Sequence, residues 1–402
     1  MKSETNAPLR RPTNHFRAHK LAKIALRNGD YRLFASAARH SIPAIPGLGR
    51  SGSSVASAIA GWVEGQIGFD DAQNLVISEL SSRTVPLDYV GVVSKWLLSA
   101  GMFTAALVLR EAADRQIRSG WLSLSRRQKE QVLIVAVQNS DRASLERLAN
   151  NFGARHAARS VLGLNAVARI AAGHQLDPVD REFAAIVDGR TVGVLGPAPL
   201  TDNERDQILA CDLVAAPVAE TSRRGEIIVP EGIDLAYADV AHTSGLRAVT
   251  WAGLPGIFIN RSRKPSSTRF LRLGHQRSAL LPPAIGRVGG ATAIPDIVFD
   301  LLASGAKHIK IAGANFYITT RAPYRRDAMR LDVNEWNVSA KNSPFFATSM
   351  FATHPPIENR NFVRTLSMSN RCTFVGEIDA VMRVGDEAAA VLLEETWSRT
   401  RR

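Results

Sequence analysis

The 402 residues of the chain are too many for one ordinary domain and predict two or three domains, since a domain usually holds roughly 100–200 residues. The composition, 45% hydrophobic and 22% charged, is typical of a globular protein and excludes a wholly disordered chain, a collagen-like chain and a small disulfide scaffold. Fifty Lys and Arg against 37 Asp and Glu leave a net charge of +13, which favours anionic partners such as nucleic acid, acidic lipid, acidic sugars or phosphates.

The sequence predicts a cytoplasmic protein. It has no run of about 18 apolar residues, so no transmembrane helix is predicted. The charged start of the chain is not followed by the apolar segment of a secretory signal. Cys211 and Cys372 form no Cys-x-x-Cys pair, which fits a reducing compartment and argues against a structural zinc. The basic patches add an expectation of peripheral contact with the inner face of the membrane.

The first half of the chain has the pattern of helices. Residues 1–14 are polar and basic and predict a flexible tail. From about Phe16 onward, helix-period segments end repeatedly at glycine, as at Gly29 and Gly101, which is the residue expected just past a helix end. Short joints between such helices are typical of antiparallel hairpins. We predict an all-α, helical-repeat-like domain over residues 15–177 that docks a protein partner, a second copy of the chain or the acceptor.

The pattern changes after Gly173, where short apolar runs begin to alternate with helix-period segments. The runs that predict buried strands lie at residues 191–196, 212–218, 246–253, 256–260, 307–313 and 371–376. Helices are predicted at residues 295–305 and 359–367, and again from Asp386 onward. This alternation predicts an α/β fold, with a Rossmann-like, mainly parallel sheet and helices on both faces. We place this domain at residues 178–402.

Three segments of the α/β domain carry the candidate site residues. The first, TVGVLGPAPLTD, is a strand that ends in a turn at Gly196, Pro197 and Ala198, before a polar helix start. Ligands bind at the carboxyl ends of strands in open α/β sheets, and the backbone N–H groups of such a turn suit phosphate. On its own the segment also fits an ordinary strand–turn–helix, because it is neither GxGxxG nor a P-loop.

The second segment, GGATAIPDIVFDLLASGAKHIKIAGANFY, opens a helix with a loop of small residues and ends on a lysine-led strand. Loop N–H groups and the Thr292 hydroxyl could hold a phosphate or a ribose. Tyr317, at the end of the strand, could donate its hydroxyl. The alternative is a plain βαβ unit in which Tyr317 is an aromatic residue at the rim.

The third segment, SMFATHPPIENRNFVRTL, places His354 between an apolar stretch and Pro355-Pro356, ahead of a helix. A histidine held rigidly beside a cleft suits general-base catalysis, because its ordinary pKa of about 6.5 lies near neutral pH. Glu358 could orient His354 or cap the helix that follows. Most histidines are surface or core residues, so this segment alone leaves the role of His354 open.

Taken together, the order and spacing of the three segments resemble bacterial sialyltransferases of glycosyltransferase family 42, over about residues 190–376. TVGVLGPAPL is similar to the family's strand and Gly-Asn-Gly-Pro-Ser turn. Thr292-Ala293-Ile294 falls at its Ser/Thr-Ser-Gly loop, and the stretch that holds Asn315 and Tyr317 is similar to its Gly-x-Asp-Phe-Tyr strand end. Tyr324 lies close to the family's second tyrosine, and His354 falls at its lone histidine before a helix.

The resemblance implies an inverting transfer of an acidic sugar from a CMP-activated donor to a glycan or glycoprotein. His354 would remove the acceptor proton, and Tyr317 with Tyr324 would hydrogen-bond the departing phosphate. The residues that it implies for the nucleotide are Gly196, Pro197, Ala198, Gly290, Thr292, Ala293 and Asn315. The family needs no metal for departure of the leaving group, residues 181–402 contain no Asp-x-Asp motif, and no cofactor is expected.

Two further interpretations stay open. Pro197 replaces the family's asparagine, and Ala293-Ile294 replaces its Ser-Gly pair, so the alternative function is a non-catalytic helical-repeat adaptor with a degenerate nucleotide-binding domain. The basic stretch 261–277 could bind an anionic polymer, lipid headgroups or RNA, or be a solvated loop. Nucleic acid is the least favoured partner, because the sequence has no aromatic-rich RNA-binding motif. The enzyme interpretation predicts that His354 and Tyr317 face one pocket with Gly196 and Thr292.

Overall fold

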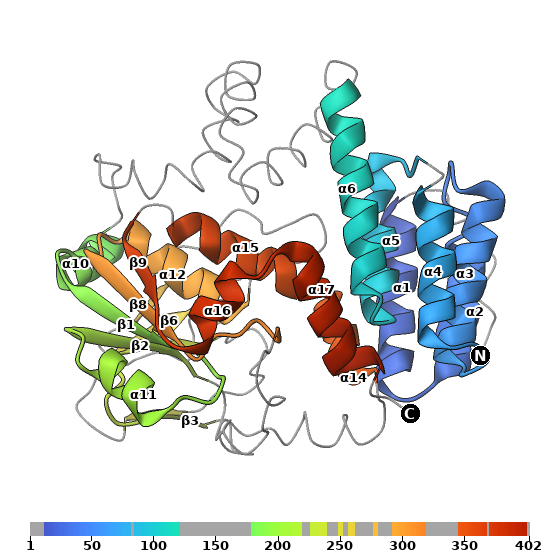
Figure 1. The fold of residues 1–402 in the computed structure, drawn as a ribbon. Helices are drawn as coiled ribbons and strands as arrows, with labels where there is room; N and C mark the ends of the chain where they lie inside the picture. The colour runs from blue at the N-terminus through green and yellow to red at the C-terminus, as the bar shows by residue number, and fades with distance from the viewer. Residues whose placement is uncertain are drawn as a thin grey trace.

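A computed structural model gives the fold (Figure 1). It describes residues 12–81, 84–120, 178–218, 226–238, 248–251, 256–261, 276–279, 292–318, 345–367 and 370–399. These residues contain both predicted parts, an N-terminal helical region and an α/β part with a parallel sheet. Residues 121–177 lie outside the described ranges, so the boundary near residue 178 stays a prediction.

Short turns join the described helices of the N-terminal region. These helices are α1 (Pro12–Arg27), α2 (Tyr31–Ser41), α3 (Gly49–Val63), α4 (Phe69–Ser81), α5 (Leu87–Ser99) and α6 (Phe103–Gly120). Each of α1, α2 and α3 packs against the next helix in the chain. Gly29 and Gly101 follow α1 and α5 in left-handed conformations, with φ of 80° and 79°, as the glycine pattern predicts. Helix α1 takes in residues 12–14, which the sequence analysis assigns to the tail.

Seven strands form one sheet in which every neighbouring pair is parallel. In sheet order they are β7 (Gln276–Ser278), β6 (Ile257–Asn260), β4 (Leu235–Ala238), β2 (Leu213–Pro217), β1 (Thr191–Leu195), β8 (His308–Ala312) and β9 (Cys372–Phe374). The predicted strand at residues 246–253 is β5 (Ala248–Trp251), which pairs with β3 (Glu226–Val229) in a separate two-stranded sheet. The sequence analysis predicts no strand at β3, β4 or β7, and β7, whose letters are QRS, has no apolar residue to signal one.

Helices cover both faces of the main sheet, as the sequence predicts. Along β1 and β2, alternate side chains enter different cores, which is the two-residue period of a strand. Val192 and Leu213 belong to the core that contains α10 (Pro178–Val187) and α12 (Ala293–Ala303). Val214 belongs to the opposite core, together with Ile208 of α11 (Asp202–Leu209). Helix α15 (Pro356–Ser367) packs on α12.

The C-terminal helices join the sheet to the helical region (Figure 1). Helix α14 (Phe346–Phe351) packs against α1 and α5, and α17 (Asp386–Glu394) packs against α6. The buried Glu394 carboxylate accepts hydrogen bonds from the Thr104 N–H at 2.6 Å and from the Gln73 side chain at 3.0 Å. The last elements also include α16 (Glu377–Arg383), before α17, and a short π-helix, η4 (Glu395–Arg399), after it. One hydrophobic core therefore runs from α1 to the sheet.

A membrane span needs about 20 mostly apolar residues. In the ranges that the structure covers, no helix is both long enough and apolar enough to cross a membrane.

Candidate functional site

The loops that follow β1 and β8 meet at the carboxyl edge of the sheet. Strand β1 lies between β2 and β8, so the order of the strands reverses direction at this point. The Gly196 N–H donates to the Ala312 carbonyl oxygen at 2.7 Å, and the Ala198 N–H donates to the Gly313 carbonyl oxygen at 2.7 Å. Ligand sites of open α/β sheets form outside the carboxyl ends of strands at such a reversal. The first two predicted segments therefore lie side by side where a ligand is expected.

Gly196 has no room for a side chain. A Cβ atom there would lie 2.1 Å from the carbonyl oxygen of Gly313 and 2.9 Å from the backbone nitrogen of Ala314. Gly313 adopts a left-handed conformation with φ of 66°, which favours glycine. The two glycines therefore let the two backbones touch, and this contact explains the glycine at position 196.

The turn at Gly196 offers fewer phosphate donors than the sequence suggests. The N–H groups of Gly196 and Ala198 are taken by carbonyl oxygens of the β8 loop, and Pro197 has no N–H. Helix α11, which follows, is closed by a capping box between Thr201 and Glu204. Residues 196–198 thus shape the edge of the sheet, and their N–H groups do not face a phosphate.

Asn315, Phe316 and Tyr317 form a tight turn after β8. The Asn315 side chain accepts the Tyr317 N–H at 3.1 Å, and Phe316 and Tyr317 have φ of 52° and 62°. Left-handed backbone in non-glycine residues costs free energy and is concentrated at functional sites. The Tyr317 ring lies 4.8 Å from the Phe351 ring, and the Trp397 indole N–H donates to the Tyr317 carbonyl oxygen at 3.1 Å. Burial raises the pKa of Tyr317 to about 12, so its hydroxyl stays protonated at neutral pH.

The start of α12 is tied to the turn that carries His354. The Thr292 N–H donates to Oδ1 of Asn359 at 2.7 Å, and Nδ2 of Asn359 donates to the Pro355 carbonyl oxygen at 2.7 Å. Thr292 precedes the first turn of α12 at Ala293, and its side chain makes no capping hydrogen bond. The positive end of such a helix attracts anions. Of the two helix starts at this edge, α12 is therefore the better match to a phosphate.

Arg261 brings a cation to the same end of α12. It directly follows β6, and its guanidinium donates to Oδ2 of Asp296, in the first turn of α12, at 2.9 Å. The two side chains are only 14% and 8% exposed. Sequence analysis treats Arg261 as the first residue of the basic stretch 261–277, and residues 262–275 of that stretch lie outside the described ranges.

His354 lies in the turn between α14 and α15. The backbone N–H of His354 donates to the Met350 carbonyl oxygen at 3.0 Å, and the His354 side chain is partly exposed. Glu358 was predicted to orient His354 or to cap α15. Its carboxylate lies 3.5 Å from the guanidinium of Arg110 in α6, so it ties α15 to the helical region.

Four parts of the three predicted segments are thus connected around the carboxyl edge. The β1 loop is bonded to the β8 loop, Tyr317 of the β8 loop contacts α14, α14 leads to His354, and the turn after His354 is bonded to the start of α12. The remaining predicted residues, Gly290 and Tyr324, lie outside the described part of the chain. Within that part, no group of three or more His, Cys, Asp or Glu side chains is placed to hold a metal ion. The expectation of a metal-independent reaction stays a prediction.

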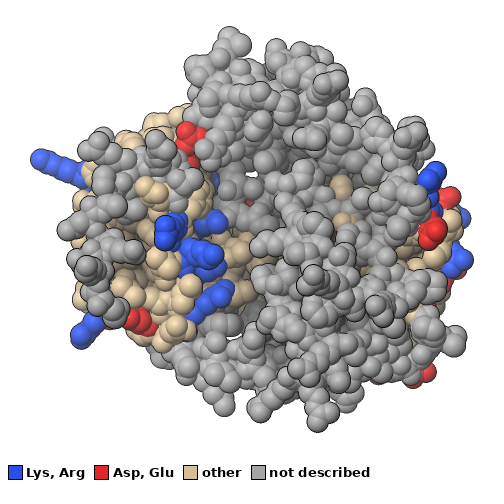
Figure 2. Space-filling model, turned by 180° about the vertical axis from the view of Figure 1, so that it is seen from behind, with Lys and Arg blue, Asp and Glu red and all other residues tan. Residues whose placement is uncertain are grey.

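Sequence analysis missed a cluster of cations on the helical region. Lys20, Lys23 and Arg27 share one face of α1, and Lys95 of α5 is close enough to affect the charge of Lys23. Figure 2 shows Lys and Arg side chains gathered on the helical region, seen from behind. Nζ of Lys23 donates to Oγ1 of Thr353, the neighbour of His354, at 2.6 Å. The helical spacing of Lys20, Lys23 and Arg27 could have predicted that they share a face. The contact between Lys23 and Thr353, 330 positions apart, could not be predicted from the sequence.

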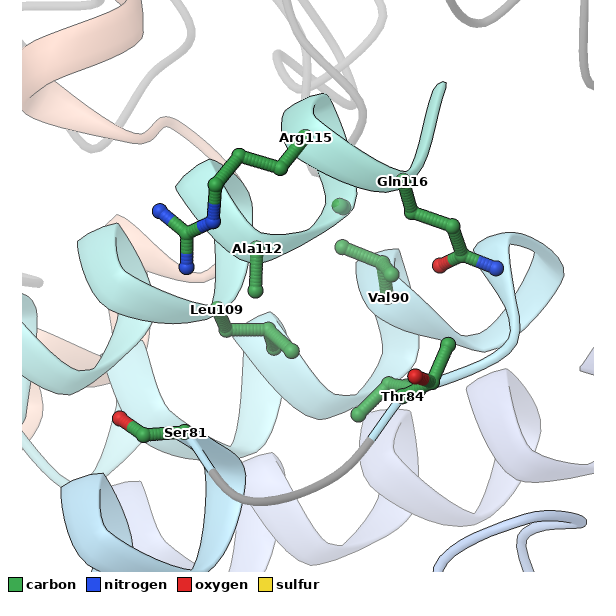
Figure 3. Close-up of a pocket in the computed structure, with 9 residues that line it drawn as sticks. Ser81, Thr84, Val90, Leu109, Ala112, Arg115 and Gln116 are labelled. Atoms are coloured by element: carbon green, nitrogen blue, oxygen red, sulfur yellow. The ribbon is translucent and has the colours of Figure 1, made fainter. Parts of the chain in front are cut away.

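A separate cavity of about 400 Å³ lies in the helical region (Figure 3). Its walls come from the end of α4, the start of α5 and α6. The lining residues are Ser81, Thr84, Val85, Val90, Leu109, Ala112, Ala113, Arg115 and Gln116. In Figure 3, Arg115 and Gln116 project from α6, while Ser81 and Thr84 lie on the opposite side. None of the predicted site residues lines this cavity, so it is distinct from the carboxyl edge.

Comparison with models of protein families, with curated proteins and with solved structures finds no match to this chain. What the described residues show is a helical N-terminal region and a parallel sheet, and the comparisons assign them to no family.

Proposed function

We propose that the chain is a glycosyltransferase that moves an acidic, sialic-acid-like sugar from a CMP-activated donor to a glycan or glycoprotein, with inversion. The observation that carries the proposal is the junction of the β1 loop, the β8 loop, the start of α12 and the His354 turn at one edge of a parallel sheet. These are the segments that carry the family resemblance. The edge is also where open α/β sheets bind ligands.

In this proposal the chain's own residues divide the work. His354 removes the proton of the acceptor hydroxyl, because an imidazole with a pKa near neutrality suits a general base. Tyr317 donates a hydrogen bond to the departing phosphate, and the positive end of α12 at Thr292 and Ala293 stabilises the same developing charge. Asn315 acts as a positioning residue, since its side chain holds the turn that places Tyr317.

The charge of the chain supports an acidic substrate. The net charge is +13, and Lys23 places a cation beside Thr353, the neighbour of His354. An anionic donor or acceptor is attracted to such a surface. The proposal includes a cytoplasmic location with peripheral membrane contact, and it gives the helical region the role of binding the acceptor or a protein partner.

Calorimetric titration with CMP tests the proposal. Wild type is expected to bind CMP in a saturable way. Tyr317→Phe keeps the ring against Phe351 but loses the hydroxyl, so CMP should bind about tenfold to a hundredfold more weakly, which is the worth of one hydrogen bond to a charged group. Tyr31→Phe, a tyrosine on α2, is the matched control and should bind like wild type.

Two results would contradict the proposal. One is a wild type that binds neither CMP nor other nucleotides, which would favour the non-catalytic adaptor. The other is CMP binding that Tyr317→Phe and Tyr31→Phe leave equally unchanged, because the nucleotide would then lie away from the β8 loop.

A further inference from the structure

The cation cluster on α1 and α5, formed by Lys20, Lys23, Arg27 and Lys95, is concentrated and partly buried. Lys20 is exposed, whereas Lys23, Arg27 and Lys95 are each partly buried. Lys23 stands three residues after Lys20 and four before Arg27, so the three side chains are neighbours on the helix surface. Like charges at such spacings destabilise a helix. The cluster therefore needs a reason other than the stability of α1.

The contacts of the cluster's lysines are with uncharged groups. Lys23 donates to the Thr353 hydroxyl at 2.6 Å, Arg27 donates to the Ser349 hydroxyl at 2.9 Å, and Lys95 lies 5.0 Å from the centroid of the Phe16 ring. Throughout the residues that the structure describes, Lys20, Lys23 and Lys95 have no ion pair with a carboxylate.

The same groups depress the proton affinity of two side chains. Burial, with Arg27, Lys95 and Lys20, lowers the pKa of Lys23 to about 8. Burial, with Lys95 and Lys23, lowers the pKa of His19 to about 3, so His19 is neutral and cannot offset or add to the charge. A charged Lys23 is therefore held at a cost to the folded state at neutral pH. Groups kept in such an unfavourable state are often functional.

We propose that Lys20, Lys23, Arg27 and Lys95 form a binding site for a phosphate or pyrophosphate group of a small molecule. An oxyanion placed beside these side chains would supply the negative charge that the three lysines lack and would accept charge-assisted hydrogen bonds. A flat lipid surface could reach the exposed Lys20 but not the partly buried members of the cluster, which favours a small ligand. The site does not depend on sugar transfer, although the Lys23–Thr353 contact places it beside His354.

Titration with inorganic pyrophosphate, followed by calorimetry and thermal unfolding, tests the site on the full chain. Wild type should bind pyrophosphate and gain thermal stability at constant ionic strength. Lys23→Met should bind it at least about tenfold more weakly, because one charge-assisted contact is lost. The same variant should be more stable than wild type without ligand, since it removes a repelled, partly buried charge. Lys307→Met, an exposed lysine ahead of β8, makes the same change in net charge and should match wild type.

The pH dependence gives a second readout. Sulfate keeps its double charge across this range, so its binding reports on the protein alone. As pH rises from about 7 to about 9, Lys23 loses its proton, and sulfate affinity should fall more steeply in wild type than in Lys23→Met, which keeps Lys95, whose pKa burial also lowers. Equal pyrophosphate affinity in wild type and Lys23→Met, or an equal loss in Lys307→Met, would overturn the site.

The source of the phosphate is tested with vesicles that contain phosphatidic acid. No Lys23-dependent binding to these vesicles is expected. Binding to vesicles that depends on Lys23, with none to pyrophosphate, would overturn the assignment to a small ligand. Pyrophosphate and CMP are titrated separately. A chain that binds pyrophosphate but not CMP would support this site and contradict the proposed function.

Discussion

Replacing Asp386 with alanine is expected to lower the free energy of unfolding by about 3–5 kcal/mol, because it leaves a buried guanidinium without its counter-charge. Asp386, at the start of α17, accepts hydrogen bonds from Arg110 of α6 at 2.5 Å, from Asn361 at 2.9 Å and from Arg360. The Arg360 side chain is 0% exposed. Its other donors bind the Asn361 side chain and the Val384 carbonyl oxygen, so loss of the Asp386 carboxylate leaves the Arg360 charge with neutral partners. Chemical denaturation measures the change.

The matched control is Asp379→Ala. Asp379 also pairs with an arginine, Arg383, but those side chains are 41% and 78% exposed. An exposed pair and a first-turn carboxylate are together worth no more than about 1 kcal/mol. Equal losses from Asp386→Ala and Asp379→Ala would contradict the view that the buried network joins α6, α15 and α17.

The same network predicts that the free energy of unfolding falls at acidic pH. Burial alone would raise the pKa of Asp386, but Arg110 and Arg360 outweigh it, and the pKa lies below its ordinary value of 3.8. A carboxyl group with a lowered pKa stabilises the fold above its unfolded pKa, and the contribution is lost as pH falls through the folded pKa. The loss is therefore expected below about pH 4 in wild type and should be smaller in Asp386→Ala.

Replacing His354 with glutamine is expected to slow release of CMP from a CMP-activated acidic sugar by about 10²–10⁴-fold in the presence of an acceptor, the usual worth of a general base. Glutamine can hydrogen-bond but cannot take a proton at neutral pH. The affinity for CMP should stay close to that of wild type, because in the proposed division of roles His354 faces the acceptor hydroxyl. The rate of CMP release and the Kd for CMP, measured on one preparation, separate the two effects.

His308→Gln is the control for that experiment. His308 begins β8, at the end of the strand opposite the carboxyl edge, and its ring nitrogen pairs with the Thr373 hydroxyl at 3.0 Å. It should turn over donor at the wild-type rate. A His354→Gln protein that is as fast as His308→Gln would remove His354 from the reaction, even if the nucleotide still bound.

Much of the fold follows from local patterns. The apolar runs of β1, β2 and β8 are visible because these central strands are mostly buried between helices. The short strand β4 has only the letters LAYA and carries no such signal. The pairing of β5 with β3, away from the main sheet, depends on contacts between segments that no period reveals.

The candidate site was predictable in its segments and not in its chemistry. The sequence around Gly196 suggests a phosphate-binding turn. In the structure, however, the N–H groups of this turn donate hydrogen bonds to carbonyl oxygens of the β8 loop. Glu358 looked like a partner of His354, yet the nearest recorded charge is Arg110, from a helix about 250 positions earlier in the chain. Such pairings are set by the docking of α14, α15 and α17 on the helical region, and sequence spacing does not encode them.

The measurement that tests the central claim most directly is amide hydrogen exchange with and without saturating CMP, followed by mass spectrometry. If one ligand site forms at the carboxyl edge, exchange should slow together in the β8 loop around residues 313–318, at the start of α12 and in the turn around His354, while the 400 Å³ cavity of α4 to α6 stays unchanged. Protection confined to that cavity, or absent from all three edge segments, would contradict the proposal that they form one nucleotide-binding site.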